Sequence, residues 1–446
     1  MDEQMKESGI QWIGAIPYSW NVERIKYIIQ NNDNGIKVGP FGSALTNEVV
    51  SSDEGKYKVY GQSNLIRKDF SYGDNYVSEQ NYKRLINYEV LPNDIAVSMM
   101  GTIGKCSVVP DNIEPGIMDS HLIKIRLSQK MLPRYFEYAY ESDMGYSQLL
   151  INSKGSIMNG LNSTIIKGLY IPVPEIIEQQ AIADFLDKEC AQIDSIAADL
   201  EKQIALLQQY KKSLITETVT KGLDKSVPMK DSGVEWTSKI PCHWEIKRFK
   251  YLCEYITDGS HFSPETADEG YPYITAADVK GVGLDYDAAK KISQQDFISL
   301  QKAGCQPRKG DVLLVKDGAT TGRIGMVTSE KPCVVLSSVA ILRAPDNMDA
   351  RYLRYLMESD FVQAQIQASM AGSAMPRTVL SKIINYWGIT CPKEEQKEIC
   401  DFLDRKCGYI ETVIETKQVQ QSIIQQHKKS LIYEYVTGKK RVKEVR

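Results

Sequence analysis

The residue types that most often carry catalysis are scattered along this chain of 446 residues. Its four histidines, His121, His243, His261 and His427, lie far apart in the sequence. The sequence contains no H-E-x-x-H zinc motif, no G-x-S-x-G nucleophile motif and no paired metal-ligand motif. We therefore expect this chain to carry neither a catalytic site nor a metal site.

The segment Gly101-Thr-Ile-Gly-Lys105 invites comparison with a phosphate-binding loop. A P-loop has the spacing G-x-x-x-x-G-K-[ST], which would require glycine in place of Met99 and a hydroxyl residue in place of Cys106. The Asn/Asp-Pro-Pro-aromatic run that amino-methyltransferases use is absent, and so is an acidic nuclease pattern. The sequence thus offers no motif for nucleotide hydrolysis, methyl transfer or phosphodiester cleavage.

The composition is that of an ordinary globular protein, with 42% hydrophobic residues, 25% charged residues and a net charge of −3. Only local basic patches could attract a polyanion, because the net charge gives no global attraction. The start MDEQMKESGI is polar, and no apolar run approaches the roughly 20 residues of a membrane span. The nine cysteines include no C-x-x-C pair, which indicates reduced thiols and a cytoplasmic location.

The chain consists of two copies of one unit. Residues 7–27 (ESGIQWIGAIPYSWNVERIKY) match residues 231–251 (DSGVEWTSKIPCHWEIKRFKY), with the tryptophans Trp12 and Trp20 in register with Trp236 and Trp244. These tryptophans recur unchanged, so we expect them to anchor the core or a partner.

Later blocks of the sequence recur as well. The run Asp184-Phe-Leu-Asp187 returns as Asp401-Phe-Leu-Asp404, whereas residues 35–88 and 257–301 barely match each other. One scaffold is therefore used twice with different variable parts. This is what a protein needs when it recognises two different targets with one geometry.

Each copy ends in a segment with a helical pattern. Residues 181–220 contain neither proline nor glycine, and the second segment follows Pro392. Apolar residues recur at every seventh position, which is typical of a coiled coil. They are Leu186, Ile193, Leu200, Leu207 and Leu214 in the first segment and Leu403, Ile410, Ile424 and Leu431 in the second, where Lys417 interrupts the series. We expect these residues to pair the two helices or to dock partner subunits.

The remaining parts indicate an α+β fold. Short apolar runs predict strands at residues 94–98, 106–109 and 121–126, and again at 311–315, 324–327 and 339–342. Residues 133–150 and 350–368 have a helical pattern, and glycine-rich turns and long loops separate the elements. We divide the chain into a globular domain (1–175), a first helix (176–222), a second globular domain (223–392) and a second helix with a basic tail (393–446).

Nearly the whole chain resembles the specificity (S, HsdS) subunits of type I restriction–modification systems. The resemblance is carried by the opening G-x-x-W-x-x-x-I-P-x-x-W in both halves, by Gly101-Thr-Ile-Gly-Lys105, and by the run Thr257-Asp-Gly-Ser-His-Phe262-x-Pro264. The duplicated Asp-Phe-Leu-Asp runs complete it. Each motif alone is unspecific, but the ordered and duplicated set is specific.

The resemblance implies that each globular part is a target-recognition domain that reads one half of a bipartite site in double-stranded DNA. The antiparallel helices, each spanning ~60 Å at 1.5 Å per residue, would fix the unread spacer between the halves. Methyltransferase (M) subunits, expected in two copies, would methylate adenine, and motor-nuclease (R) subunits would cleave. S-adenosylmethionine, ATP and magnesium would all bind to these partners, and none of them to this chain.

Small, polar or basic loop residues are the candidates for DNA contacts, because glutamine and asparagine suit adenine edges and arginine or lysine suits guanine. In the first domain they are Lys37, Ser43, Gln62, Ser63, Asn64, Arg67, Lys68, Lys105, Ser156 and Asn159. In the second domain they are Thr257, Asp258, Ser260, His261, Thr275, Lys316, Thr320, Arg323, Ser373 and Arg377. Each could instead be an ordinary turn residue, and His261 could pack against Phe262.

Three other interpretations stay open at this point. The chain could serve a modification-only assembly, which has the same sequence features. It could be a coiled-coil scaffold that does not bind DNA, which the near-neutral net charge favours. It could also be an enzyme acting alone, although no catalytic cluster supports that reading.

Overall fold

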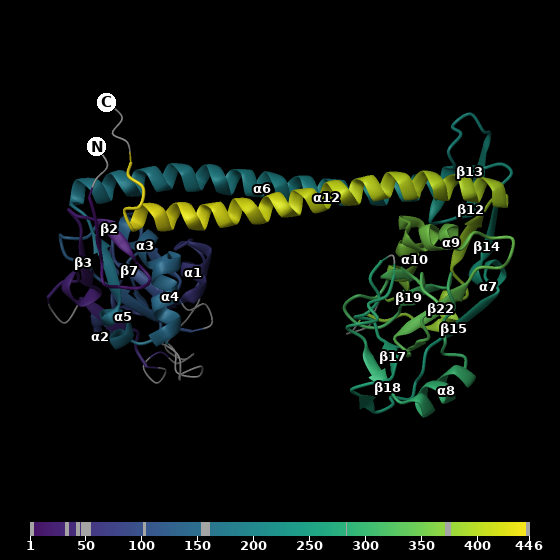
Figure 1. Cartoon of the computed structure of the whole chain (residues 1–446), viewed down its shortest axis with the longest axis horizontal. Coiled ribbons are helices and arrows are strands. Elements are labelled where there is room, and N and C mark those ends of the chain that lie inside the picture. Colours follow the sequence, from purple (N-terminus) through teal and green to yellow (C-terminus); the bar gives the residue numbers. More distant parts are fainter. Residues whose placement is uncertain are drawn as a thin grey trace. The chain divides into compact units, whose positions relative to one another are not determined.

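The computed structural model describes residues 4–31, 35–41, 45, 55–100, 104–152, 161–281, 283–370 and 376–442. The chain forms two compact units, each of which combines a globular part with sections of two long helices (Figure 1). The first unit comprises residues 1–199 and 420–446, and the second comprises residues 200–419. Both ends of the chain therefore belong to the first unit.

The first unit contains, among its described residues, a four-stranded antiparallel sheet with the strand order β4-β10-β7-β8. A smaller sheet, β6-β5-β9, and the strand pairs β1–β2 and β3–β11 accompany it. The strands are β1 (Met5–Glu7), β2 (Ala15–Pro17), β3 (Asn21–Arg24), β4 (Ile36–Val38), β5 (Tyr57–Tyr60), β6 (Tyr76–Val77), β7 (Ile95–Ser98), β8 (Cys106–Val108), β9 (Gly116–Met118), β10 (Leu122–Ile125) and β11 (Tyr170–Val173). The helices are η1 (Ile25–Tyr27), α1 (Gln62–Arg67), α2 (Glu79–Arg84), η3 (Ile86–Tyr88), α3 (Pro133–Glu141), α4 (Asp143–Asn152) and α5 (Ser163–Gly168).

The second unit repeats this plan with the sheet β15-β22-β19-β20 and the smaller sheet β16-β18-β17-β21. Its strands are β12 (Met229–Val234), β13 (Thr237–Pro241), β14 (Glu245–Arg248), β15 (Tyr255–Asp258), β16 (Thr266–Ala267), β17 (Tyr271–Ile274), β18 (Lys290–Ile292), β19 (Val312–Val315), β20 (Ile324–Met326), β21 (Val334–Val335), β22 (Val339–Arg343) and β23 (Trp387–Thr390). Its short helices are α7 (Phe249–Leu252), α8 (Gln294–Lys302), α9 (Ala350–Glu358), α10 (Asp360–Ser369) and α11 (Leu380–Ile383). The α+β prediction and the six predicted strands are confirmed.

One ion pair recurs at the same place in both sheets. Arg126 binds both carboxylate oxygens of Asp94 (2.7 and 2.8 Å), and Arg343 binds Asp311 in the same way (2.8 and 2.7 Å). Asp94 and Asp311 are buried, and each also accepts a backbone N–H from the preceding turn. Since a buried carboxylate without its partner is costly, this pair fixes the entry into each central strand.

The helical pattern of residues 133–150 and 350–368 resolves into two helices in each unit. The break falls at Ser142 and at Ser359, whose backbone is extended (ψ 164° and 149°) and whose hydroxyls donate to the carbonyl three residues earlier. Serine competes for backbone hydrogen bonds in this way, and so it interrupts a helix that the apolar pattern alone would continue.

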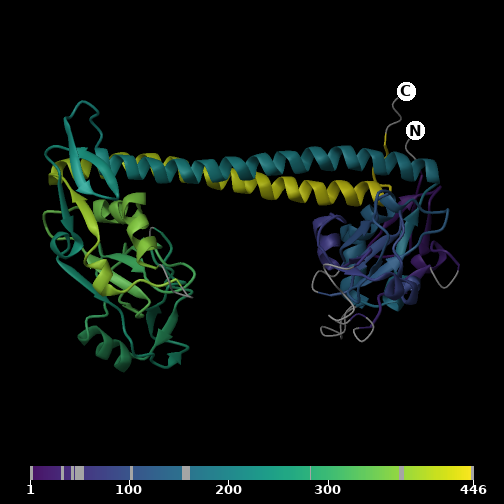
Figure 2. The ribbon, with the colours of Figure 1, turned by 180° about the vertical axis from the view of Figure 1, so that it is seen from behind.

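The two long helices are α6 (Ile176–Lys221) and α12 (Lys393–Val436), with 46 and 44 residues. Within the first unit, Phe185 contacts Tyr435 and Asp194 binds Lys428, so the helices run antiparallel there. Within the second unit, Gln203 contacts Lys417 and Lys211 binds Glu411, which gives the same antiparallel arrangement. Figure 2 shows the pair from behind. The predicted antiparallel pairing is confirmed within each unit.

Most of the predicted seam faces the partner helix or the globular part. Leu186, Ile193, Leu200, Leu403, Ile410 and Leu431 are buried, whereas Leu207, Leu214 and Ile424 are half-buried. Cys190 and Cys407 are buried beside them, as expected for small apolar residues. Lys417, which breaks the series, is half-buried and donates a hydrogen bond to Gln203 Oε1 (2.6 Å). A polar pair thus occupies one layer of the seam.

Each globular part is joined to both helices through one recurring tryptophan. Trp20 is buried and donates to Glu178 at the start of α6 (2.9 Å), while its ring lies against Gly438 after the end of α12. Trp244 donates in the same way to Glu395 at the start of α12 (3.0 Å), and its ring lies against Gly222 after the end of α6. Both glycines have positive φ, so a side chain there would be strained as well as crowded. The expectation that these tryptophans anchor the core is confirmed.

Candidate nucleic-acid interface

Loops from distant parts of the sequence converge at one end of the central sheet in the second unit. They are the loop after edge strand β15, the loop after β19, the loop before β22 and the segment around Arg377. Backbone hydrogen bonds join them: Lys316 N–H donates to Ser338, and Thr378 N–H donates back to Lys316. We call the side chains at this end of the sheet the second loop cluster.

The second loop cluster holds a continuous series of ion pairs. Lys316 lies between Asp258 (3.5 Å) and Asp317 (3.3 Å) and is only 2% exposed. Asp317 also binds the Nε atom of Arg377 (2.8 Å), and His261 Nε2 lies 3.2 Å from Asp258. Four of the predicted DNA-binding residues, Asp258, His261, Lys316 and Arg377, are therefore brought together, although they come from three separate segments.

The members of this series differ in how they meet solvent. The side chains of His261 and Arg377 are 71% and 57% exposed, so their polar atoms can reach a ligand. Lys316 and Ser260 are buried, and the hydroxyl of Ser260 both accepts from Phe262 N–H and donates to Phe262 O. In this structure the buried residues hold the loops, and the exposed ones present donors.

Other predicted residues of the second unit lie at the margin of the cluster. Thr275 is tied through its N–H and hydroxyl to Asp278 (2.8 and 2.7 Å). Arg323 donates to Val279 O (3.4 Å), and Thr320 lies in the turn after β19. Thr257 lies on β15 and is half-buried. The side chains of Thr275 and Arg323 thus support the turns that border the cluster.

The first unit has an equivalent cluster made of different side chains. Gln62, at the start of α1, donates to Ser98 Oγ (2.9 Å) and to Met100 O. His121 Nδ1 lies 3.1 Å from Asp119 Oδ2 in the loop before β10. The backbone bonds also correspond, since Met99 N–H donates to His121 O as Lys316 N–H donates to Ser338 O. The same backbone frame therefore carries Gln62 and His121 in the first unit, whereas in the second unit it carries Lys316, Arg377 and His261 at other positions of the frame.

The glycine that follows each edge strand shows how closely this frame is repeated. A side chain at Gly39 would place its first carbon 1.8 Å from the backbone oxygen of Asp119. At Gly259 the same atom would lie 2.2 Å from Val335 O and 2.4 Å from Leu336 O. Only glycine allows this close approach, so the entry into the loop is fixed in both units.

Three basic residues predicted in the first unit gather around α1 and α3. Lys68 binds Glu137 (2.5 Å) and lies 3.7 Å from Glu141, and Lys105 lies 3.8 Å from Glu141. Arg67 lies over the ring of Tyr72 at 4.1 Å. Lys68 and Lys105 are exposed and paired with α3 carboxylates.

The remaining predictions for the first unit have different surroundings. Asn64 is buried, and its amide group binds the backbone of residues 61, 69 and 72, which makes it a turn-forming residue. Ser63 is exposed on α1, and Lys37 is half-buried on β4 opposite Lys124. Ser43, Ser156, Asn159 and Ser373 lie outside the described residues.

The two lysine pairs of the long helices, Lys211-Lys212 and Lys428-Lys429, are largely bound to carboxylates. Lys211 binds Glu411, Lys212 binds Asp360 (2.5 Å) and Lys428 binds Asp194. Lys429 is exposed.

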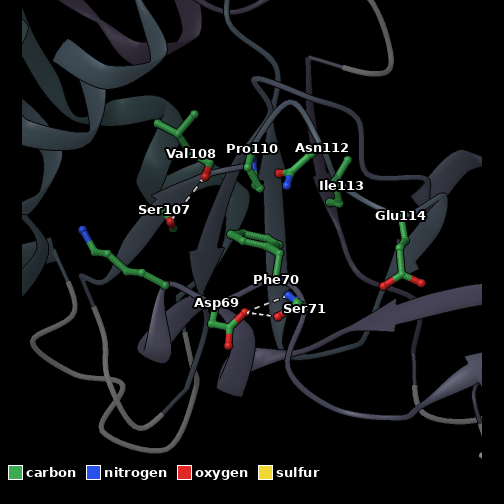
Figure 3. A pocket seen from close by; sticks show the side chains of 10 residues that line it. Asp69, Phe70, Ser71, Ser107, Val108, Pro110, Asn112, Ile113 and Glu114 are labelled. Carbon is green, nitrogen blue, oxygen red and sulfur yellow. Dashed lines mark hydrogen bonds between the residues drawn. The ribbon is translucent and has the colours of Figure 1, made fainter.

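A cavity of about 350 Å³ lies between the end of α1 and the loop after β8 in the first unit (Figure 3). Asp69, Phe70, Ser107 and Glu114 are among the residues that line it. The Ser71 hydroxyl and N–H both donate to Asp69 and hold the pKa of that carboxyl below its ordinary value, so Asp69 stays ionised and is a poor general base. We find no nucleophile–base pair among the residues that line this cavity.

Burial also makes several thiols of the chain poor nucleophiles. All nine cysteines are free. Burial raises the pKa of the Cys253, Cys333 and Cys391 thiols to about 12, so they remain protonated at neutral pH. Within the described ranges, no group of three or more His, Cys, Asp or Glu side chains is placed to hold a metal ion, and no helix could cross a membrane.

Sequence reasoning missed several residues of the two clusters. Asp317, Ser98, Asp119 and His121 belong to them but were not predicted as contacts. The sequence contained a signal that could have located these loops. Asp94 and Asp311 are equivalent residues of the repeat, and the loops after β7 and β19 begin at the same number of residues after them. Phe262 was also missed; it is 63% exposed.

The family model for the type I restriction modification DNA specificity domain matches the chain twice, at residues 41–206 and 241–423. The two matches fall on the two halves of the repeat. They cover both loop clusters and most of both long helices.

Similar proteins extend over most of the chain. It is 24% identical over 336 residues to the type I restriction enzyme MjaVIII specificity subunit of Methanocaldococcus jannaschii, which covers 74% of this chain and 76% of that protein. It is 25% identical over 353 residues to the type I restriction enzyme EcoBI specificity subunit of Escherichia coli (75% and 71%). A chain from a solved structure of the type I R-M system has the same fold, with a TM-score of 0.70 at 14% identity over 94% of this chain and 98% of that one.

Proposed function

Because the chain belongs to the family of type I restriction–modification DNA specificity proteins, we propose that its two units read the two halves of one bipartite DNA site. The observation that carries this proposal is the pair of loop clusters. The same backbone frame occurs in both units, fixed by Gly39 and Gly259, yet it presents different side chains. Because the backbone is the same and the side chains differ, the two units can enter the DNA groove in the same way and recognise two different half-sites.

The clusters match what groove recognition requires. Gln62 offers an amide suited to an adenine edge, and Arg377 offers a guanidinium suited to guanine. The carboxylates of the second cluster are each paired with a cation, which lowers their repulsion of phosphates. This local pairing of charges would allow DNA to bind although the net charge of the chain is −3.

The chain would act together with partner subunits. Tyr27 and Tyr251 occupy equivalent positions in the two repeats and are 59% and 71% exposed, which supports two equivalent docking surfaces. We propose that two methyltransferase subunits bind these recurring surfaces and the long helices, and that motor-nuclease subunits complete the complex. In this proposal S-adenosylmethionine, ATP and magnesium bind to the partners, the chain itself is not catalytic, and the complex works in the cytoplasm.

Mapping of methylated adenine across the host genome, with and without this gene, tests the proposal. We expect one bipartite motif to lose methylation when the gene is deleted. Exchange of the second globular part (residues 223–392) for that of a relative should then change only one half of the motif. An unchanged methylation pattern in a strain that expresses the protein would contradict the specificity role.

A second measurement addresses catalysis. The purified chain alone should neither transfer methyl groups nor cleave DNA, whereas the complex with methyltransferase subunits should methylate. Cleavage that appears only with motor-nuclease subunits would distinguish a restriction complex from a modification-only assembly.

A further inference from the structure

The loop after the edge strand of each central sheet carries an exposed aromatic ring. Phe41 in the first unit is 83% exposed, and Phe262 in the second unit is 63% exposed. The strand registers place Phe41 at the position of His261, directly before Phe262. A phenyl ring in water adds nothing to the packing of its own unit, and in both units the loop that carries it also borders the loop cluster.

The backbone that presents Phe262 is held on both sides. Its N–H donates to Ser260 Oγ (3.0 Å), and its carbonyl accepts from Ser260 Oγ (2.7 Å) and from Tyr273 Oη (3.2 Å). Gly259, three residues earlier, lies so close to the backbone of Val335 and Leu336 that a side chain at this position would collide with it. The ring is thus presented by a fixed loop, which reduces the conformational entropy that binding would cost.

The surroundings of Phe262 favour nucleic acid as the ligand. Its neighbour His261 belongs to the ion-pair series that ends at the exposed Arg377, so the ring lies at the edge of the second loop cluster. In the first unit Phe41 lies two residues after Gly39, whose backbone lies close to that of Asp119, the partner of His121. In both units an apolar ring therefore stands beside polar groups suited to base edges.

We propose that Phe41 and Phe262 insert as apolar wedges against the base steps of the two half-sites. The inference rests on the proposed function and adds a role to it. A phenyl ring has no donor or acceptor with which to distinguish bases, so these residues would supply affinity and local deformation of the duplex, while the polar neighbours supply sequence recognition.

The test uses the full chain in complex with its methyltransferase subunits and a duplex that carries the bipartite site found by methylation mapping. 2-Aminopurine placed in the second half-site reports loss of base stacking. We expect Phe262→Ala to weaken binding about ten- to a hundredfold, equally on the mapped site and on sites with one changed base. The 2-aminopurine signal should fall as well, and Phe262→Leu should restore much of both.

Ile298→Ala, at an exposed apolar residue of α8, is the matched control and should leave binding unchanged. Unchanged affinity and fluorescence for Phe262→Ala would overturn the inference. So would loss of methyltransferase assembly with normal DNA binding by the complex that still forms, because the ring would then be a protein contact. A wild-type complex without any site preference would instead refute the proposed function.

Discussion

At the scale of single residues, the second loop cluster shows how a protein of near-neutral charge can present a cation. Arg377 is bound to Asp317 through Nε, and more than half of its side chain is exposed. A guanidinium held at Nε can turn its outer edge toward a guanine, whose O6 and N7 accept two parallel hydrogen bonds. Asp317 is then a positioning residue for Arg377.

Arg377→Lys should therefore keep the positive charge but lose the pair of parallel N–H donors of the guanidinium group. We expect it to reduce discrimination at one guanine of the second half-site by about 1–3 kcal/mol, with a smaller loss for Asp317→Asn. Competition binding with half-site variants at fixed salt measures this. If the loss is uniform over all variants, Arg377 contacts phosphate and does not read a base.

Glu358 illustrates the cost of a partly buried carboxyl, since its side chain is 21% exposed. Burial raises the pKa of Glu358, and Arg354, 3.7 Å away, lowers it by less. An acid whose native pKa is raised stabilises the fold fully only below its ordinary pKa of about 4.3, and that stability is lost as the pH rises through the native value. Glu358→Gln should thus unfold at a higher urea concentration than the wild type at pH 7, with the difference vanishing near pH 4. A less stable variant at pH 7 would show that the pairing with Arg354 outweighs desolvation.

At the scale of elements, the long helices combine a coiled-coil seam with docking onto the globular parts. Leu403 and Cys407 are buried in the same core as Trp244 and Tyr352, so α12 serves both purposes with one face. The polar layer of Lys417 and Gln203 is the exception. A polar residue in such a seam specifies register at a cost in stability.

Lys417→Leu should stabilise the second unit by about 1 kcal/mol, because an apolar side chain fills the half-buried layer better than an ammonium group does. Urea unfolding of the full chain measures the gain. Lys406→Leu, at an exposed position of the same helix, is the control and should give none. A loss of stability in Lys417→Leu would mean that the pair with Gln203 holds the register.

At the scale of the whole molecule, the segment after α12 binds to the N-terminal part of the first unit. Lys439 donates to Ile13 O (3.0 Å), and Arg441 binds Glu178 (2.5 Å), which also accepts from Trp20. The start of the chain, the start of α6 and the segment after α12 thus meet within the first unit. In the second unit His243 takes the place of the arginine beside Glu395 (2.9 Å).

Truncation after Gly438 should therefore loosen the first unit by about 1–2 kcal/mol, since it removes both cations and leaves Glu178 partly buried without its arginine. Hydrogen–deuterium exchange should show faster exchange in β1–β3 and unchanged exchange in β12–β14. The second unit, which contains none of the removed residues, is the internal control. Equal protection of β1–β3 in both proteins would contradict the role of the tail.

The sequence by itself determined the duplicated plan, the central strands and the helix seam. These features are local or periodic: a buried strand such as β7 is an apolar run, and a coiled-coil helix repeats every seven residues. The core role of the recurring tryptophans could also be predicted, because a side chain that is the same in both copies belongs to the part of the fold that both copies share. The helix breaks at Ser142 and Ser359 were not predicted. A serine hydroxyl that binds a carbonyl of its own helix does not change the pattern of apolar residues.

Only the tertiary structure decided which loop residues meet. Arg377, Asp317 and Asp258 are far apart in sequence and come together because edge strand β15 pairs with β22 and β22 with β19. The same folding buries Asn64, Ser260 and Lys316 and exposes Phe41 and Phe262. A loop sequence states which groups are available. Whether they face the solvent or one another depends on strand order and on the close backbone approach at Gly39 and Gly259, which no local pattern contains.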